Sequence, residues 1–327
     1  MKLELPPYMR LLPPEIQAQF ANTKFAPRGF VSGFKSGEHR SQRLGTSTEF
    51  AEHREYSPGD DPADLDWRVF GKMDRYYVKQ YVEETNLQVT IVLDTSASMG
   101  FKGTHASRSY SRLDHASRVA ALLASVFLKQ GDAVGLVQMN ASVTGWLPAR
   151  SNPAQLRRIL EALYETRPDG ESNPAAAMHE IAERLPKRGI VFLISDWLSD
   201  LDPIADALHH LRHRGHQISV FHTLSEEELT FPYSSAAQFK DMEGVTEDLD
   251  IDPASIRRQY LDQLTAYLSE LKSVCRKVPA DYTLFNTKEA YEVVLRSFFV
   301  KRMGGARRHS IEPIRNVSGK LRSNGMR

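Results

Sequence analysis

The hydrophobic pattern between residues 87 and 302 alternates short apolar runs with longer stretches of helical periodicity. Residues 87–93 and 190–195 are runs of continuous apolar character, as expected of parallel strands that are buried on both faces. In residues 113–130 the apolar side chains fall on one face of a helix, which Gly131 ends. This alternation predicts an α/β domain built on an open, mostly parallel and doubly wound sheet.

The same periodicities place the other elements of the domain. We expect further strands at residues 133–139, 143–147, 217–222 and 282–285, the second of them antiparallel to the first. We expect further helices at residues 153–165, 174–185, 203–214, 253–276 and 288–302. Two helix starts carry capping signals: Ser111 and Asp114 are spaced as a capping box, and Asn173 precedes Pro174 at a first helical position.

The segments on either side of this domain have a different character. Upstream, residues 77–82 alternate polar and apolar side chains with a period of two, which predicts a half-buried strand. Downstream, residues 304–327 are rich in Arg, Gly and Ser and contain a single acid, Glu312. We therefore divide the chain into an N-terminal extension with β structure (1–86), the α/β domain (87–303) and a basic tail (304–327) that we expect to be disordered.

Composition and charge narrow the possible classes of function. The chain has 327 residues and a formal net charge of +1, so the molecule as a whole has no electrostatic bias toward nucleic acid or membranes. Cys275 is the only cysteine, which excludes an intrachain disulfide and favours a reducing compartment. The N-terminus lacks the apolar core of a signal peptide, and no apolar run approaches the roughly 20 residues that span a bilayer. We therefore expect a cytoplasmic protein with no membrane partner.

Oxygen-bearing side chains gather where two of the apolar runs end. Asp94 follows the first run and begins the sequence DTSASMG, so that Asp94, Ser96 and Ser98 share one tight loop. Asp196 follows the run at 190–195, and Ser172 stands just before a capped helix. Open α/β sheets bind ligands in the loops at the carboxyl ends of their strands, and Mg²⁺ prefers six oxygen ligands at roughly 2.1 Å. The pattern therefore predicts a metal site that these five residues form.

This arrangement resembles the metal-ion-dependent adhesion site of von Willebrand factor type A domains. That site combines Asp-x-Ser-x-Ser, a distant Thr and an Asp at a strand end. The resemblance implies that both serines of the loop ligate the ion directly, and that the two aspartates do so directly or through water. Two positions depart from the family pattern: Ser172 stands at the Thr position, and Trp197 follows Asp196 where many relatives have Gly. We therefore expect a bulkier rim than usual beside Asp196.

A closer resemblance covers most of the chain, from about residue 37 to the last predicted helix. The sequences REYSPGDD (54–61), LDWR (65–68), VK (78–79) and EE (83–84) are similar to those of one bacterial branch of von Willebrand A-like proteins, known as domain of unknown function fifty-eight. This resemblance implies a cytoplasmic protein that works with a MoxR-class AAA+ ATPase in the assembly or maturation of other proteins.

These patterns favour a binding protein over an enzyme, with no catalytic residues. We expect one Mg²⁺ ion, with Mn²⁺ or Ca²⁺ as alternatives, and an open coordination position that a carboxylate of a partner protein fills. A Mg²⁺-dependent phosphotransferase or phosphatase is the alternative, but Ser96 stands where phosphoaspartate enzymes commonly carry a second Asp. A nucleic-acid-binding protein that acts through the basic tail is a third hypothesis, although that tail has no aromatic residue for base stacking.

Two other groups of residues are of types that can bind metals or act as nucleophiles, but we assign them no functional role. His209, His210, His213 and His216 lie close together in the sequence, but no Glu accompanies them in the arrangement of zinc proteases. We interpret them as surface histidines at the end of a helix. Cys275 lies among the apolar residues of a predicted helix, and we interpret it as a small buried hydrophobic residue.

Overall fold

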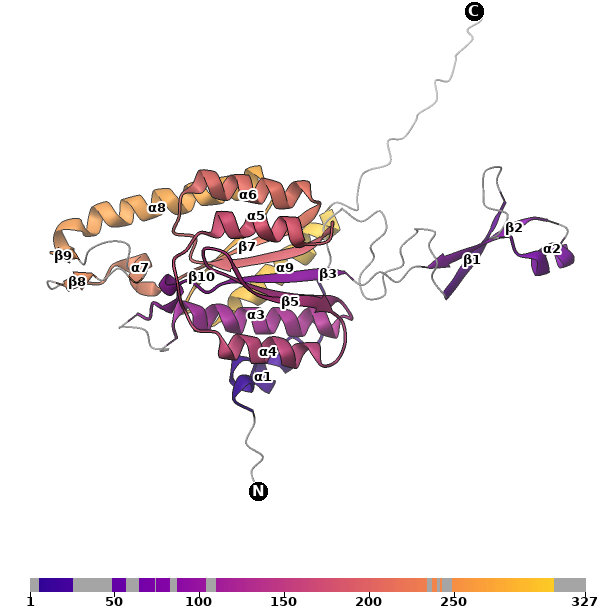
Figure 1. Ribbon diagram of the computed structural model, residues 1–327, viewed down its shortest axis with the longest axis horizontal. Helices are drawn as coiled ribbons and strands as arrows, with labels where there is room; N and C mark the ends of the chain where they lie inside the picture. Colours follow the sequence, from indigo (N-terminus) through magenta and orange to yellow (C-terminus); the bar gives the residue numbers. More distant parts are fainter. Residues whose placement is uncertain are drawn as a thin grey trace, which may run out of the picture.

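A six-stranded sheet of order β10-β7-β6-β3-β4-β5 lies at the centre of the computed structural model (Figure 1). Its strands are β3 (Gln88–Asp94), β4 (Ala133–Met139), β5 (Val143–Arg150), β6 (Gly189–Ser195), β7 (His216–Leu224) and β10 (Asp281–Asn286). Every neighbouring pair is parallel except β4 and β5. The predicted fold class and the predicted antiparallel strand are therefore confirmed. The structure describes residues 6–25, 49–56, 65–73, 75–82, 87–103, 110–233, 237–239, 242 and 249–308.

Helices cover both faces of the sheet, as the doubly wound prediction requires (Figure 1). One face packs against α3 (Arg112–Lys129), α4 (Gln155–Glu165) and α9 (Tyr291–Arg308), and the other against α5 (Pro174–Arg184), α6 (Leu201–His213) and α8 (Pro253–Lys277). Each face of the sheet has its own hydrophobic core. Alternate side chains of β3 pack into one core or the other, because successive side chains of a strand point to opposite faces. Ile91 and Leu93 lie in the first core, and Val92 lies in the second.

Side-chain caps begin two helices at the carboxyl edge of the sheet. The Ser111 hydroxyl accepts a hydrogen bond from the Asp114 backbone N–H at 3.0 Å, and the Asp114 carboxylate accepts one from the Ser111 N–H at 3.1 Å. The Asn173 side chain accepts a hydrogen bond from the Ala176 N–H at 3.1 Å, with Pro174 at the first helical position. Both predicted caps are confirmed, and they fix where α3 begins after the loop that follows β3 and where α5 begins after the loop that follows α4.

Residues 7–25 of the predicted extension pack onto the α/β domain itself. They form a 3-10 helix, η1 (Pro7–Leu11), and a short helix, α1 (Pro14–Gln19), which are too short to show a helical period in the sequence. Leu12, Phe20 and Phe25 are buried in the same core as α3. The core of the α/β domain therefore includes a part of the chain that lies far upstream of residue 87.

The rest of the extension contains a pair of strands with a helix between them in sequence. β1 (Glu49–Glu55) pairs antiparallel with β2 (Tyr77–Val82), which confirms the strand predicted at residues 77–82. The helix α2 (Trp67–Met73) starts after Asp66, whose backbone carbonyl accepts a hydrogen bond from the Phe70 N–H at 3.1 Å. Residues 57–64 and 83–86, which carry part of the family resemblance, and the basic tail after residue 308 lie outside the described residues.

Four short elements complete the described structure, and the sequence pattern predicted none of them. They are the 3-10 helix η3 (Ala97–Gly100) in the loop after β3, α7 (Glu226–Thr230), which follows β7, and the antiparallel pair β8 (Ala237–Phe239) and β9 (Leu249–Ile251). A capping box between Ser225 and Glu228 begins α7. Within the described ranges, no helix has the length and apolar character needed to cross a membrane.

Candidate metal centre

The two predicted aspartates lie at the ends of neighbouring strands. Asp94 is the last residue of β3, and Asp196 directly follows β6. The two strands pair in parallel with Leu93 opposite Ile194, so both carboxylates are placed at the same edge of the sheet. Asp94 is 1% exposed and Asp196 is 2% exposed, which means that their charges need partners inside the protein.

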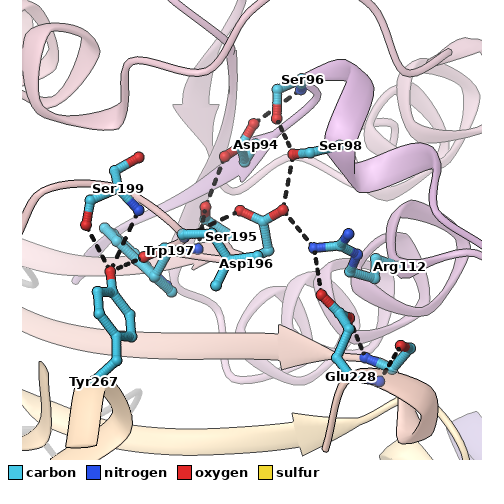
Figure 2. Close-up of polar contacts among 12 residues, drawn as sticks. Asp94, Ser96, Ser98, Arg112, Ser195, Asp196, Trp197, Ser199, Glu228 and Tyr267 are labelled. Atoms are coloured by element: carbon cyan, nitrogen blue, oxygen red, sulfur yellow. Dashed lines mark hydrogen bonds and ion pairs between the residues drawn. The ribbon is translucent and has the colours of Figure 1, made fainter. Parts of the chain in front are cut away.

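Hydrogen bonds hold both carboxylate oxygens of Asp94 (Figure 2). Oδ1 accepts one from the Ser96 backbone N–H at 2.9 Å, and Oδ2 accepts one from the Ser195 hydroxyl at 2.6 Å. The Ser195 oxygen in turn accepts a hydrogen bond from the Trp197 N–H at 3.0 Å. Ser195 was not among the predicted site residues, although a hydroxyl at the end of an otherwise apolar strand is a signal that could have identified it.

Two serine hydroxyls connect the Asp94 loop to Asp196. Ser96 Oγ and Ser98 Oγ are 3.1 Å apart, and Ser98 Oγ donates a hydrogen bond to Asp196 Oδ2 at 2.8 Å (Figure 2). In an octahedral site with ligands at roughly 2.1 Å from Mg²⁺, neighbouring ligand oxygens are about 3 Å apart. These oxygen–oxygen distances match that spacing, and a donor set of carboxylate and hydroxyl oxygens fits a hard divalent cation.

Ser172 lies in a third loop, which adjoins the Asp94 loop. The Ala97 N–H donates a hydrogen bond to the Gly170 carbonyl at 2.9 Å, and the Asp169 N–H donates one to the Thr95 carbonyl at 2.9 Å. Ser172 itself is half-buried. The structure thus brings the loop of Ser172 beside the loop of the motif, and a contact between its hydroxyl and an ion stays a prediction.

A buried arginine and a third carboxylate complete the polar cluster. Arg112 Nη1 is 2.6 Å from Asp196 Oδ2 and 3.3 Å from Glu228 Oε1 (Figure 2). The Arg112 side chain is only 6% exposed. Neither Arg112 nor Glu228 was predicted to belong to the site, because charged residues in the first turn of an amphipathic helix ordinarily face solvent.

Sequence comparison assigns the chain to a family. The family described as "Protein of unknown function DUF58" matches residues 52–268, about two thirds of the chain. The chain belongs to the DUF58 family. It is also similar to the uncharacterized protein Rv1480 of Mycobacterium tuberculosis (strain H37Rv), with 25% identity over 299 residues that cover 90% of this chain and 92% of that protein. The family resemblance predicted from residues 54–84 is therefore confirmed.

Solved structures similar to this DUF58 protein include two that cover about two thirds of it. One is the conserved hypothetical protein BatB from Bacteroides thetaiotaomicron, with a TM-score of 0.43 and 17% identity, covering 68% of this chain and 100% of that one. The other is the VWA domain of SpRpn10, with a TM-score of 0.38 and 9% identity, covering 65% of this chain and 95% of that one. Both likenesses are too distant to transfer residue roles.

The cluster in this DUF58 protein contains more negative than positive side chains. Burial, together with the nearby charge of Asp196, raises the pKa of Asp94 to about 6, and opposing hydrogen bonds lower it only in part. Burial also raises the pKa of Glu228, against the attraction of Arg112. Among the described residues, the three carboxylates of Asp94, Asp196 and Glu228 therefore share the guanidinium of Arg112. A divalent cation near Asp94 and Asp196 would supply the missing positive charge.

Trp197 does not form the bulky rim that we expected, so that prediction is wrong. Its side chain is fully buried, and its indole N–H donates a hydrogen bond to the Phe221 carbonyl at 3.1 Å. The Trp197 backbone has φ of +52°, in the left-handed region, and its carbonyl contacts the Tyr267 hydroxyl of α8. This conformation places the indole in the core of the protein, where its size does not obstruct the site.

The remaining sequence candidates lie outside the site. His209 and His213 are exposed, as predicted, but His216 is buried, so the interpretation as a surface residue is wrong for it. His216 begins β7, and burial, with a contribution from the charge of Arg214, lowers its pKa to about 4. Cys275 is fully buried, and burial raises the pKa of its thiol to about 12. The interpretation of Cys275 as a small buried hydrophobic residue is confirmed.

Proposed function

We propose that this DUF58 protein is a protein-interaction module that depends on one divalent cation, held by Asp94, Ser96, Ser98 and Asp196. A further hydroxyl from Ser172 is proposed as the fifth ligand. The observation that carries the proposal is the pair of serine hydroxyls that connects the Asp94 loop to Asp196, with oxygen–oxygen distances of 3.1 and 2.8 Å that suit neighbouring ligands of one ion. The described part of the chain has no group of three or more His, Cys, Asp or Glu suited to a metal ion, so the hydroxyls are essential to the proposed site.

The position of this cluster in the sheet supports a ligand-binding role. The chain passes from β3 to β4 on one side of the sheet, and later returns to form β6 on the other side of β3. The strand order therefore reverses at β3. Open α/β sheets bind their ligands outside the carboxyl ends of the strands at such a switch point. The two aspartates lie at that point, one on each side of the boundary between β3 and β6.

The proposed ion would act as a bridge to another protein. Two carboxylates and neutral hydroxyls leave coordination positions that water or an incoming carboxylate fills. Mg²⁺ is our first candidate, with Mn²⁺ or Ca²⁺ as alternatives. A carboxylate of a partner protein would gain a direct contact with the ion, and the family resemblance makes a MoxR-class AAA+ ATPase, or its client, the first partner to test. The protein would then serve as an adaptor in assembly or maturation of other proteins.

Binding is favoured over catalysis because the loop lacks a group that could serve as an acid. Ser96 occupies the position where phosphoaspartate enzymes commonly have a second Asp, and the Ser96 hydroxyl lies 3.1 Å from the Ser98 hydroxyl. A serine hydroxyl does not release a proton in the neutral pH range. A phosphotransferase that uses Asp94 as nucleophile remains the alternative that the experiment must distinguish.

The test measures Mn²⁺ binding to the full chain by electron paramagnetic resonance, with Mg²⁺ and Ca²⁺ as competitors. We expect one Mn²⁺ per chain. Asp94→Asn should weaken binding by on the order of a hundredfold, because it removes one of only two carboxylates that face the ion. The control is Asp132→Asn, since Asp132 is also a buried carboxyl but precedes β4, at the opposite edge of the sheet. That variant should bind Mn²⁺ as the wild type does.

The partner is tested in the same series, with a purified MoxR-class ATPase. Chelation and Ser98→Ala should both weaken the complex by on the order of a hundredfold, because each removes the bridging cation. Equal Mn²⁺ binding by the wild type and Asp94→Asn would contradict the metal site. Metal-dependent hydrolysis of a phosphoester, lost in Asp94→Asn, would instead favour the phosphotransferase alternative.

A further inference from the structure

Arg112 occupies a position that the resemblance to adhesion sites does not explain. It is the first residue of α3, and its backbone N–H donates a hydrogen bond to the Phe101 carbonyl at 3.0 Å. Its guanidinium is buried and reaches Asp196 Oδ2 at 2.6 Å. Figure 2 shows Arg112 on the side of Asp196 that faces away from Trp197. The cluster thus contains its own cation in contact with a proposed metal ligand.

The arginine occupies the Asp196 oxygen that faces the serine hydroxyls of the proposed site. Asp196 Oδ2 accepts hydrogen bonds from the Ser98 hydroxyl at 2.8 Å and from Arg112 at 2.6 Å, so both of its lone pairs are used. A divalent ion can replace the hydrogen bond from Ser98, because the hydroxyl and the carboxylate can both ligate that ion. While the guanidinium remains at this distance, the ion would bind beside a second positive charge, and two cations held so close repel each other strongly where water is excluded.

Glu228 provides a second position for the guanidinium. Its Oε1 is 3.3 Å from Arg112 Nη1, and its Oε2 accepts a hydrogen bond from the Ser225 backbone N–H at 2.8 Å in the capping box of α7. The cap holds the carboxylate in one orientation, with Oε1 directed at the arginine. Arg112 can therefore leave Asp196 and keep an ion pair with Glu228, so displacement does not leave a buried charge without a partner.

We infer that Arg112 is an internal competitor of the divalent ion for Asp196 and that it sets the metal affinity of the site. This inference rests on the proposed function. Arg112 neutralises Asp196 through their contact at 2.6 Å. Binding of the ion would move Arg112 toward Glu228, which would link the metal site to α7 and to the first turn of α3. A weak site of this kind responds to the presence of a partner carboxylate, because the partner supplies the binding energy that displaces the arginine.

The experiment is a double-mutant cycle on the full chain, with the Kd for Mn²⁺ as the readout. Arg112→Gln should bind Mn²⁺ about tenfold more tightly than the wild type, because the competing charge is gone. Glu228→Gln should bind it more weakly, because Asp196 is then the remaining carboxylate that pairs with Arg112 among the described residues. In the double variant, Glu228→Gln should change the Kd for Mn²⁺ by a smaller factor, because the glutamate acts through the arginine. Arg184→Gln is the control, because Arg184 pairs with Glu180 on the exposed face of α5 and should leave Kd unchanged.

The outcomes separate this inference from the proposed function. Unchanged or weaker Mn²⁺ binding by Arg112→Gln, with normal binding by the wild type, overturns the inference and leaves the metal site standing. An equal effect of Glu228→Gln in both backgrounds also overturns it. Absence of Mn²⁺ binding in all variants removes the proposed function and the inference together. If Arg112→Gln does not fold, as judged by circular dichroism, Glu228→Gln still decides, because an affinity equal to the wild type contradicts competition.

Discussion

Asp132 is a buried carboxyl far from the proposed metal site. It lies in the turn between α3 and β4 and is 4% exposed. Burial raises its pKa from 3.8 to about 7, although a hydrogen bond with the Leu87 backbone acts in the opposite direction. The ionised form of Asp132 is therefore less favourable in the folded protein than in the unfolded chain, where the carboxyl is solvated. Protonation of this residue favours folding.

This residue should make the stability of the protein depend on pH. Between about pH 4 and pH 7 the folded chain binds more protons at Asp132 than the unfolded chain, so the free energy of unfolding falls as pH rises, by up to about 4 kcal/mol, and levels off above pH 7. Asp132→Asn should lose this slope and be more stable than the wild type at pH 8. Urea unfolding of both proteins at several pH values measures the difference in their free energies of unfolding. Other titrating groups, such as His216, contribute equally to both proteins and cancel in that difference. Identical slopes would refute the prediction.

At the residue scale, the sequence predicted which side chains lie together better than it predicted their surroundings. The oxygens of Asp94, Ser98 and Asp196 converge as the motif suggested. The burial of Arg112 could not be predicted, because its sequence position at a helix start gives no sign of the carboxylates that surround it in the fold. The orientation of Trp197 depends on one backbone angle in the left-handed region, which a pattern of residue types does not specify.

At the element scale, the predictions succeeded where a long periodic segment also had a cap or a turn residue. The helix predicted at 113–130 is observed as α3, between the Ser111 capping box and Gly131. The strands predicted at 87–93 and 190–195 are observed as β3 and β6 within one residue at each end. By contrast, η1, α1 and α7 have five or six residues each, which is less than two helical turns. So short a segment shows no amphipathic period, and tertiary contacts decide its structure.

The capping box of α3 should contribute measurably to stability. Ser111→Ala removes the oxygen that accepts a hydrogen bond from the Asp114 N–H, and we expect the free energy of unfolding to fall by about 1 kcal/mol. Thermal or urea unfolding measures the loss. Ser269→Ala is the matched control, because Ser269 is exposed in the interior of α8 and Ala has a higher helix propensity than Ser. A loss of equal size in both variants would show that the cap has no special role.

At the scale of the whole molecule, the packing of the N-terminal segment is separate from the polar cluster at the carboxyl edge of the sheet. The N-terminal segment closes the face of the sheet that α3 and α9 cover, where Phe25 lies 5.0 Å from Phe127 between ring centroids. Arg112 is at the other end of α3, fifteen residues before Phe127, a distance of about 22 Å along the helix. The two ends of α3 therefore have different surroundings: the C-terminal end packs in the hydrophobic core, and the N-terminal end contacts the polar cluster.

Because the two ends of α3 lie far apart, a substitution at one end can test whether residues 7–25 belong to the folded domain without disturbing the proposed metal site. Phe25→Ala should lower the free energy of unfolding by about 3 to 5 kcal/mol, because it leaves a cavity among four other phenylalanine rings. Val300→Ala, on the exposed face of α9, should change it by less than about 0.5 kcal/mol. Below the unfolding transition, Phe25→Ala should bind Mn²⁺ with the Kd of the wild type, since the cavity lies far from Asp196. A loss of stability under about 1 kcal/mol would mean that the N-terminal segment is dispensable to the core.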